Sequence, residues 1–220
     1  MSAGPGFNFL EAAGQTDIGR RRANNEDALL LLPETGVFCV ADGIGGGEGG
    51  EIASHNAVES IRQEFEGRHH PHQGGDNIYD RSQRVVRSLN HASKWIYEQG
   101  PGGDGKGAGT TVVAMIFGHS PPQRAMVLHA GDSRAYLFRD NALEPMTIDH
   151  SLAAAAGFAD ESDVPVVFQG VITRAVGIYP HVQVELTPVA IQEGDLYLLC
   201  SDGLTRMLSD GEIQKTLRKH

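Results

Sequence analysis

Cysteine is scarce in this sequence, and long apolar runs are absent from it. The 220 residues include only two cysteines, Cys39 and Cys200, which lie far apart inside short apolar runs. This placement favours two small buried side chains in a reducing compartment over a disulfide or a catalytic thiol. We therefore expect a cytoplasmic protein.

Basic residues are also few, and their shortage argues against several classes of partner. The 18 Lys and Arg residues stand against 28 Asp and Glu residues, which gives a net charge of −10. Such a balance argues against nonspecific binding to nucleic acid or to an anionic membrane surface. No apolar run approaches the roughly 18 residues of a membrane span, and the first ten residues lack a secretory pattern. We expect a monomer with no nucleic-acid or membrane partner.

Length and periodicity predict one domain over residues 1–220, with sheets flanked by helices. Apolar residues recur at helical spacing in 51–65 and 82–98, and Ser209 and Glu212 fit a capping box that opens a last helix. Because the strands and helices do not alternate regularly, we predict an α+β fold with antiparallel sheets. The segments rich in β-branched and aromatic residues that indicate strands are 37–41, 110–117, 125–130, 135–138, 182–186 and 196–200.

Three aspartates stand where an apolar strand ends. Asp42, Asp132 and Asp202 each follow such a run, and each is followed at once by Gly or Ser. One Asp-Gly pair alone usually marks a turn. Three carboxylates that converge would repel one another unless a cation offset the cost, and Mg²⁺ or Mn²⁺ prefers carboxylate, carbonyl and water ligands. The pattern therefore predicts a site for hard divalent cations.

The densest basic patch, residues 20–22, precedes a fourth acidic element, Glu26 and Asp27. Such a run is usually a solvated face, but beside carboxylates a guanidinium can hold a phosphate bidentately. Cations and arginine together suggest hydrolysis of a phosphorylated substrate by a water that two metal ions activate.

The sequence contains no phosphate-binding P-loop, no nucleophile elbow and no His-Glu-x-x-His pair. The histidines of loop 67–80 could bind a transition metal, although a solvated loop is the favoured interpretation.

Seven short motifs in order resemble the metal-dependent protein serine/threonine phosphatases of type 2C, in particular their bacterial members. The resemblance runs from Asp17 to Leu208 and so covers nearly the whole chain. The matching segments are Arg22–Asp27, Val40–Gly46 with Glu51–Ser54 behind it, Gly109–Thr111, Ala130–Ala135, Asp149–Leu152, Ile172–Gly177 and Cys200–Leu204.

The resemblance implies a four-layer sandwich of two antiparallel sheets flanked by helices, with two Mn²⁺ or Mg²⁺ ions at one end and a third, weaker metal site. It implies phosphorylated proteins as substrates and a cognate serine/threonine kinase as counterpart, and it places a mobile flap at about 152–171. It also implies a role for each matching residue. Asp42 bridges both ions and is catalytic, the Gly43 carbonyl binds the first ion, and Asp202 binds the second and is catalytic. Asp132 binds the third ion, Glu26 and Asp27 hold waters on the metals, and Arg22 binds the substrate phosphate.

Two departures from the family pattern matter. Some members have a histidine after the first Asp-Gly that can protonate the leaving group, and here that position is Ile44. Members also end with a strand whose Asp-Asn supplies a ligand of the second metal, whereas this sequence stops at His220 in the preceding helix. We therefore expect the C-terminal end of the domain to be missing. An active phosphatase, a catalytically weak domain that binds a phosphoprotein or regulatory partner, and an incomplete chain all fit the sequence.

Overall fold

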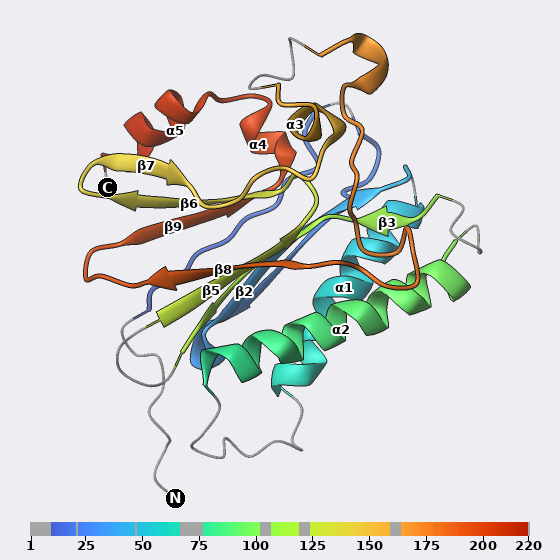
Figure 1. The fold of residues 1–220 in the computed structure, drawn as a ribbon, viewed down its shortest axis with the longest axis horizontal. Helices are drawn as coiled ribbons and strands as arrows, with labels where there is room; N and C mark the ends of the chain where they lie inside the picture. The colour runs from blue at the N-terminus through green and yellow to red at the C-terminus, as the bar shows by residue number, and fades with distance from the viewer. Residues whose placement is uncertain are drawn as a thin grey trace, which may run out of the picture.

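Two antiparallel sheets pack face to face between layers of helices (Figure 1). The computed structural model describes residues 10–20, 22–46, 48–66, 77–101, 107–118, 124–158 and 164–219. The larger sheet has the order β1-β2-β4-β5-β8, and the short β3 also pairs with β2. Its strands are β1 (Asp27–Leu32), β2 (Val37–Ile44), β3 (Gly109–Thr110), β4 (Val112–Phe117), β5 (Arg124–Ala130) and β8 (Glu185–Ala190).

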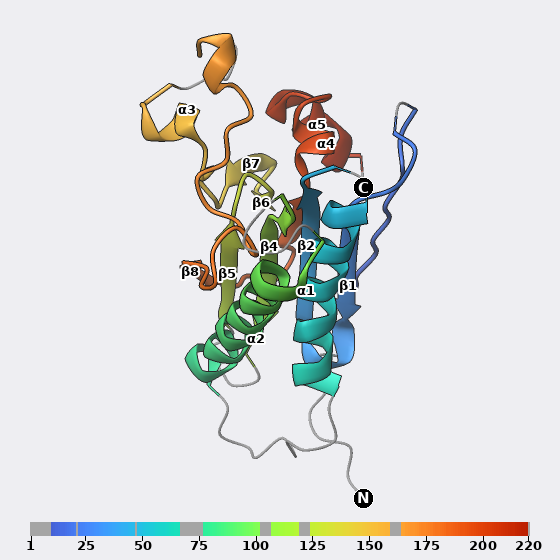
Figure 2. The same cartoon turned by 90° about the vertical axis from the view of Figure 1, so that its right-hand side faces the viewer.

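The smaller sheet has the order β7-β6-β9. Its strands are β7 (Ala142–Pro145), β6 (Arg134–Arg139) and β9 (Leu196–Cys200). Two long helices, α1 (Glu48–Glu66) and α2 (Ile78–Gln99), lie side by side on the outer face of the larger sheet (Figure 2). The short helices α4 (Asp202–Thr205) and α5 (Asp210–Leu217) lie over the smaller sheet (Figure 1). One-turn elements complete the fold: α3 (Leu152–Ala155) and 3₁₀ turns at Pro33–Thr35 and Val166–Phe168.

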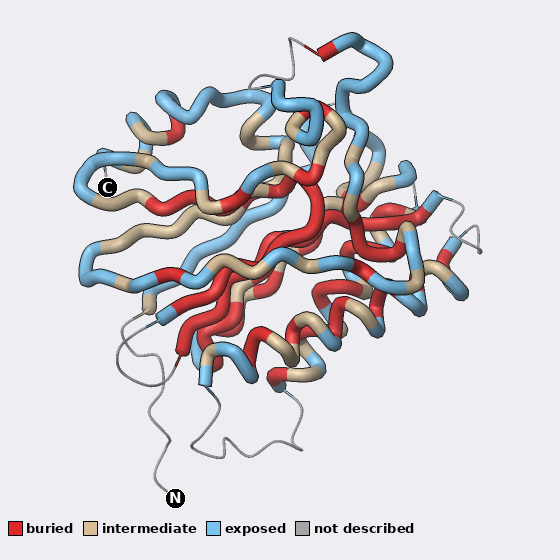
Figure 3. The backbone as a smooth tube through the Cα atoms, viewed as in Figure 1, coloured by how far each residue is buried: buried red, intermediate tan, exposed pale blue. Residues whose placement is uncertain are grey.

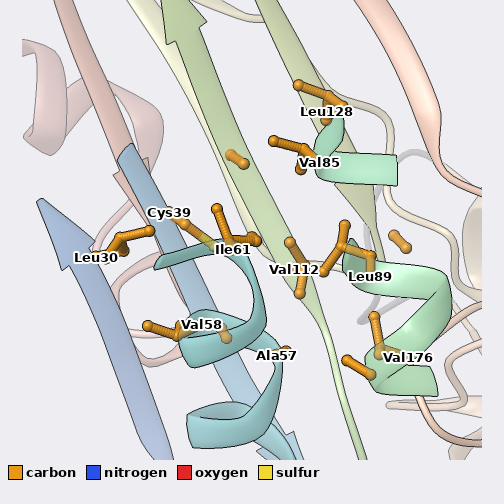
Figure 4. Packing of buried hydrophobic residues seen from close by; sticks show 14 of the residues in the cluster. Leu30, Cys39, Ala57, Val58, Ile61, Val85, Leu89, Val112, Leu128 and Val176 are labelled. Atoms are coloured by element: carbon orange, nitrogen blue, oxygen red, sulfur yellow. The ribbon is translucent and has the colours of Figure 1, made fainter. Parts of the chain in front are cut away.

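Strand β4 shows why the chain forms four layers. All six of its residues are buried, because Val112, Ala114 and Ile116 face the helices while the alternate residues face the smaller sheet. On the helix side, Val112 packs among side chains from α1 and α2 (Figure 4). Full burial of each large aliphatic side chain contributes about 1.5–3 kcal/mol. The buried stretches run through the middle of the molecule and leave the outer faces of the helices exposed (Figure 3).

The strand register brings acidic residues to one end of the sandwich. Asp27 lies directly opposite Asp42 in the β1–β2 pair. Val112 at the start of β4 pairs with Ala130 at the end of β5, so the turn that carries Asp132 follows at the same edge. In the smaller sheet the end of β9 pairs with the start of β6, and Asp202 comes two residues after β9. Four separate segments therefore deliver carboxylates to neighbouring positions.

Most predicted elements are present, with one strand wrong and two missed. The expected strand 182–186 is wrong, since β8 begins at Glu185 and runs to Ala190. The strands β1 and β7 were not predicted. The capping box of Ser209 and Glu212 is confirmed at the start of α5, and the two cysteines are buried and free, as expected.

Several expectations fall partly outside the described residues, namely Arg21 of the basic run, 67–76 of the histidine-rich loop and 159–163 of the flap. The mobility of the flap and the lack of a final ligand-bearing strand stay predictions. Within the part of the chain that the structure describes, no helix combines the length and the apolar character that a bilayer span requires.

Candidate metal centre

A pocket of about 450 Å³ opens where the strand ends converge. It contains the three aspartates that the sequence predicted to meet, Asp42, Asp132 and Asp202, together with Glu26 and Arg22. Asp27 is not part of the lining, and its carboxylate instead accepts a hydrogen bond of 2.8 Å from the Ser201 hydroxyl. The lining residues are Arg22, Ala23, Asn24, Glu26, Asp42, Gly43, Ile44, Gly45, Gly46, Thr111, Asp132, Ile172 and Asp202.

Backbone and hydroxyl hydrogen bonds fix Asp42 at the centre of this pocket. Its carbonyl accepts from the Thr111 amide at 2.8 Å and from the Thr110 hydroxyl at 2.9 Å. Its amide donates to the Thr111 hydroxyl at 3.3 Å, and that hydroxyl shares a hydrogen bond of 2.6 Å with Ser133. Since Ser133 follows Asp132 directly, the network also links two of the aspartates.

Gly43 occupies a position that no other residue type fits. A Cβ atom there would lie 2.3 Å from the Gly50 carbonyl oxygen and 2.8 Å from that of Glu26. The Gly43 amide also donates to the Glu26 carbonyl at 3.0 Å. The missing side chain therefore lets β2, the start of α1 and the segment before β1 approach one another closely.

In the ion pair of Arg22 and Glu26 at the pocket, the arginine is exposed and the glutamate is buried. The Arg22 Nη1 atom lies 3.4 Å from Glu26 Oε2, and the two side chains are 59% and 6% exposed. A long contact on a mostly exposed arginine contributes little to stability. The Arg22 guanidinium is therefore free to exchange this partner for an anion that enters from solvent.

Asp132 carries a buried oxygen without a partner. The residue is 8% exposed, and its Oδ1 atom has no hydrogen-bond partner among the described residues. Burying a charged oxygen in this way is costly unless a cation or donor satisfies it. The orphaned oxygen thus indicates that a ligand completes the site.

Burial and neighbouring negative charges shift the pKa values of two carboxylates in the pocket. Burial, and next to it the negative charges of Asp27, Asp202 and Asp132, raises the pKa of Asp42 to about 8. Burial and the charge of Asp202 raise the pKa of Asp132 to about 6. Both shifts have the sign that desolvation and like charge produce, and a divalent cation would reverse them. The oxygen ligands that line the pocket, which are the carboxylates and the backbone carbonyl of Gly43, therefore fit Mn²⁺ or Mg²⁺.

A second group of potential ligands does not have the geometry of a metal site. Ligand atoms of His129, His150 and Glu185 lie within 4.8 Å of one another, but the two imidazole rings are stacked, with centroids 4.3 Å apart and planes 10° from parallel. Ring nitrogens bind ions in the plane of the ring, so parallel rings cannot both aim at one ion. The guanidinium of Arg174 also lies 3.1 Å from His150 Nε2.

We interpret this group as a hydrogen-bond network beside the pocket. The Gly131 amide donates to His150 Nδ1 at 3.2 Å, and His150 Nε2 lies 3.1 Å from Glu185 Oε2. Burial lowers the pKa of His150, in keeping with a neutral ring. The network thereby ties the turn before Asp132 to β8.

Sequence reasoning missed two contacts at the centre. The Thr111–Ser133 hydrogen bond joins residues 22 positions apart, and no local pattern indicates it. The second is an ion pair between Asp202 and Arg206. Their spacing of four residues, together with the start of a helix at Asp202, was a signal that could have found it.

Comparison with known proteins gives a consistent result. A family model for protein phosphatase 2C matches residues 15–219. The serine/threonine phosphatase stp of Listeria innocua is 30% identical over 216 residues, 95% of this chain and 83% of that protein. The serine/threonine protein phosphatase PstP of Mycobacterium tuberculosis is 33% identical over 213 residues, 95% of this chain and 39% of that protein.

Solved structures agree with the sequence relatives. The catalytic domain of PstP in complex with two manganese ions superposes with a TM-score of 0.74 at 33% identity, over 93% of this chain and 82% of that one. PppA, described as a regulatory component of T6SS in Pseudomonas aeruginosa, gives a TM-score of 0.77 at 29% identity, over 90% and 80%. With its four-layer fold and its carboxylate pocket, the chain belongs to the protein phosphatase 2C family.

Proposed function

We propose that this pocket hydrolyses phosphoserine and phosphothreonine residues of proteins with the help of two Mn²⁺ or Mg²⁺ ions. The observation that carries the proposal is that Asp42, Asp132 and Asp202 line one pocket, in which the buried Oδ1 atom of Asp132 has no hydrogen-bond partner among the described residues. Arg22, whose contact with Glu26 is long, lines the same pocket and can bind an anion instead. The chain is thus a metal-dependent protein serine/threonine phosphatase, as its family membership supports.

The proposed ligand set follows from where each group lies. Asp42, at the centre of the carboxylates, would bridge the two ions, with the Gly43 carbonyl on the first ion and Asp202 on the second. Asp132 would serve the third, weaker site through its orphaned oxygen. Glu26, buried in the lining, and Asp27, held by Ser201, would accept hydrogen bonds from surrounding waters.

The chemistry divides between the ions and the protein. Divalent ions in such a pair lower the pKa of water and stabilise charge on the phosphoryl oxygens. Arg22 would hold the phosphate through its guanidinium fork once it leaves Glu26. Ile44 lines the pocket and has no proton to give, so the side chain at this position would not protonate the leaving alkoxide.

Phosphorylated proteins are the substrates that this function requires, and a cognate serine/threonine kinase would be the counterpart that produces them. We further propose a single phosphatase domain that acts as a monomer. A reducing, cytoplasmic location is supported by the two buried free cysteines.

The test measures hydrolysis of p-nitrophenyl phosphate and of a phosphothreonine peptide by the purified chain with Mn²⁺. We expect turnover that EDTA abolishes and that Asp42→Asn lowers by about 1,000-fold or more. Glu59→Gln, which removes one exposed carboxylate of α1 far from the pocket lining, is the matched control and retains full activity. Tight phosphopeptide binding in calorimetry without any turnover would instead establish a phosphoprotein-binding domain.

A further inference from the structure

The carboxylate of Asp202 contacts a positive side chain at the C-cap of α4, Arg206. Arg206 Nη2 lies 2.8 Å from Asp202 Oδ2, which is shorter than the 3.4 Å contact between Arg22 and Glu26. The Arg206 amide also donates to the Asp202 carbonyl at 2.8 Å. Because this bond closes one turn of α4, the two side chains leave the helix on the same face.

The charge of Arg206 acts on more than one carboxylate of the pocket. The Asp202 side chain also shares a hydrogen bond with Asp42, which contributes to the raised pKa of Asp42. The positive charge of Arg206 reaches further, since it acts to lower the pKa of Asp132 against the larger effect of burial. One guanidinium therefore offsets negative charge on two proposed metal ligands.

The environment of Arg206 allows its guanidinium to leave. The Arg206 side chain is 47% exposed, whereas that of Asp202 is 21% exposed. A Cβ atom on Gly170 would lie 3.8 Å from Arg206 Nη2, so the guanidinium lies beside the segment that follows the 3₁₀ turn Val166–Phe168. A half-exposed arginine can move into solvent at little cost in packing.

We propose that the Arg206 guanidinium competes with the divalent ion for the Asp202 carboxylate. This competition lowers the affinity of the second metal site for Mn²⁺ and so raises the Mn²⁺ concentration at which that site fills. The inference rests on the proposed ligand set, in which Asp202 holds the second ion. Binding of that ion then requires Asp202 to exchange a guanidinium for the metal, because two positive groups on one carboxylate repel each other. Arg206 is a positioning residue in this scheme, since it acts through Asp202.

Calorimetry with Mn²⁺ and the metal-free chain of 220 residues tests the proposal independently of turnover. Arg206→Gln removes the charge and retains a long polar side chain, and we expect the second Mn²⁺ to bind about 3- to 10-fold more tightly. Arg206→Lys keeps the charge and should stay nearer to the unmodified protein. Lys215→Gln removes the same charge from an exposed position on α5, and we expect it to change the affinity by less than about 2-fold.

Ionic strength and the metal-free state give further readouts. Raising the salt concentration should shrink the difference between Arg206→Gln and the unmodified protein, because screening weakens the ion pair. Without metal, Arg206→Gln should melt at a lower temperature, since Asp202 then faces Asp42 without its counter-charge. A merely structural role for Arg206 would lower the melting temperature without tightening Mn²⁺ binding.

The variant Asp202→Asn separates this inference from the proposed function. If Asp202→Asn leaves Mn²⁺ binding unchanged, the ligand set is wrong and the inference fails with it. If Asp202→Asn weakens Mn²⁺ binding while Arg206→Gln binds Mn²⁺ no more tightly than the unmodified protein, the role of Arg206 is overturned and the ligand set stands.

Discussion

At the scale of single residues, Gly43 is the position with least freedom at the metal centre. Gly43→Ala would press a Cβ atom against the backbone of Gly50 and Glu26, and backbone cannot yield as a side chain can. We predict a loss of about 2 kcal/mol or more in the free energy of unfolding, measured by urea denaturation. Gly211→Ala is the matched control: it lies in α5 with open space around it and should stabilise by up to about 1 kcal/mol. Equal effects of the two variants would contradict the argument.

Thr111 acts on the metal centre through Asp42. Thr111→Val keeps the shape of the side chain but leaves the Asp42 amide and the Ser133 hydroxyl without a partner. We predict a loss of about 1–3 kcal/mol in unfolding free energy and Mn²⁺ binding that is weaker by about 10-fold. Unfolding curves and calorimetry check the two effects. Thr216→Val, at an exposed site on α5, should change stability by less than about 0.5 kcal/mol; an equal loss at both sites would count against a special role for Thr111.

At the scale of elements, the ends of β2, β5 and β9 bring carboxylates close together. The folded-state pKa of Asp42, about 8, lies above its ordinary value of 3.8. The folded protein therefore holds this proton more tightly than the unfolded chain does, and the metal-free protein loses stability as pH rises from about 4 to 8. Because a metal ion must displace the proton, we predict that Mn²⁺ binds about 10-fold or more tightly at pH 8 than at pH 6.

Calorimetry at several pH values checks this dependence, and proton release on Mn²⁺ binding should follow the same curve. Asp42→Asn removes the titrating group, so its remaining Mn²⁺ affinity should vary less with pH. An affinity of the unmodified protein that does not change between pH 6 and 8 would show that Asp42 is already ionised before the metal binds.

The same elements show how far sequence alone leads. Strand β9 could be predicted because Leu196–Cys200 is a dense apolar run that ends at a polar residue. Strand β8 could not be placed, since it contains Pro188, which is compatible with a strand only because β8 lies at the edge of its sheet. Strand β7 is short and largely exposed, although Asp140 and Asn141, both with positive φ, mark the two-residue turn that joins it to β6.

At the centre, the signal for the three aspartates was that each follows an apolar strand. Strands β2 and β5 both pair antiparallel with β4, so they run in the same direction and end at the same edge of the sheet. The partners of those aspartates could not be predicted. The hydroxyls of Thr111 and Ser133 meet only because β4 and the turn after β5 lie side by side. A tertiary contact of this kind leaves no periodic signal in the sequence.

At the scale of the whole molecule, the proposed ligands come from both sheets. Asp42 belongs to the larger sheet, Asp202 follows β9 of the smaller sheet, and Asp132 lies in the turn from β5 to β6 that crosses between them. Ions bound to all three would therefore link the two sheets at one end of the sandwich. Without ions, the same end holds carboxylates that repel one another, and burial together with the neighbouring negative charges raises the pKa of Asp42.

This arrangement predicts that metal stabilises the entire fold and not only the pocket. At 100 times its dissociation constant a ligand adds about 2.7 kcal/mol to stability, and for a domain of this size that raises the melting temperature by about 5–10 °C. Thermal melts with Mn²⁺ and with EDTA measure the effect, and Asp42→Asn should lose most of it. Hydrogen exchange adds the spatial test: Mn²⁺ should slow exchange at the ends of both β2 and β9. Slowing confined to one sheet would mean that the ions do not link the two.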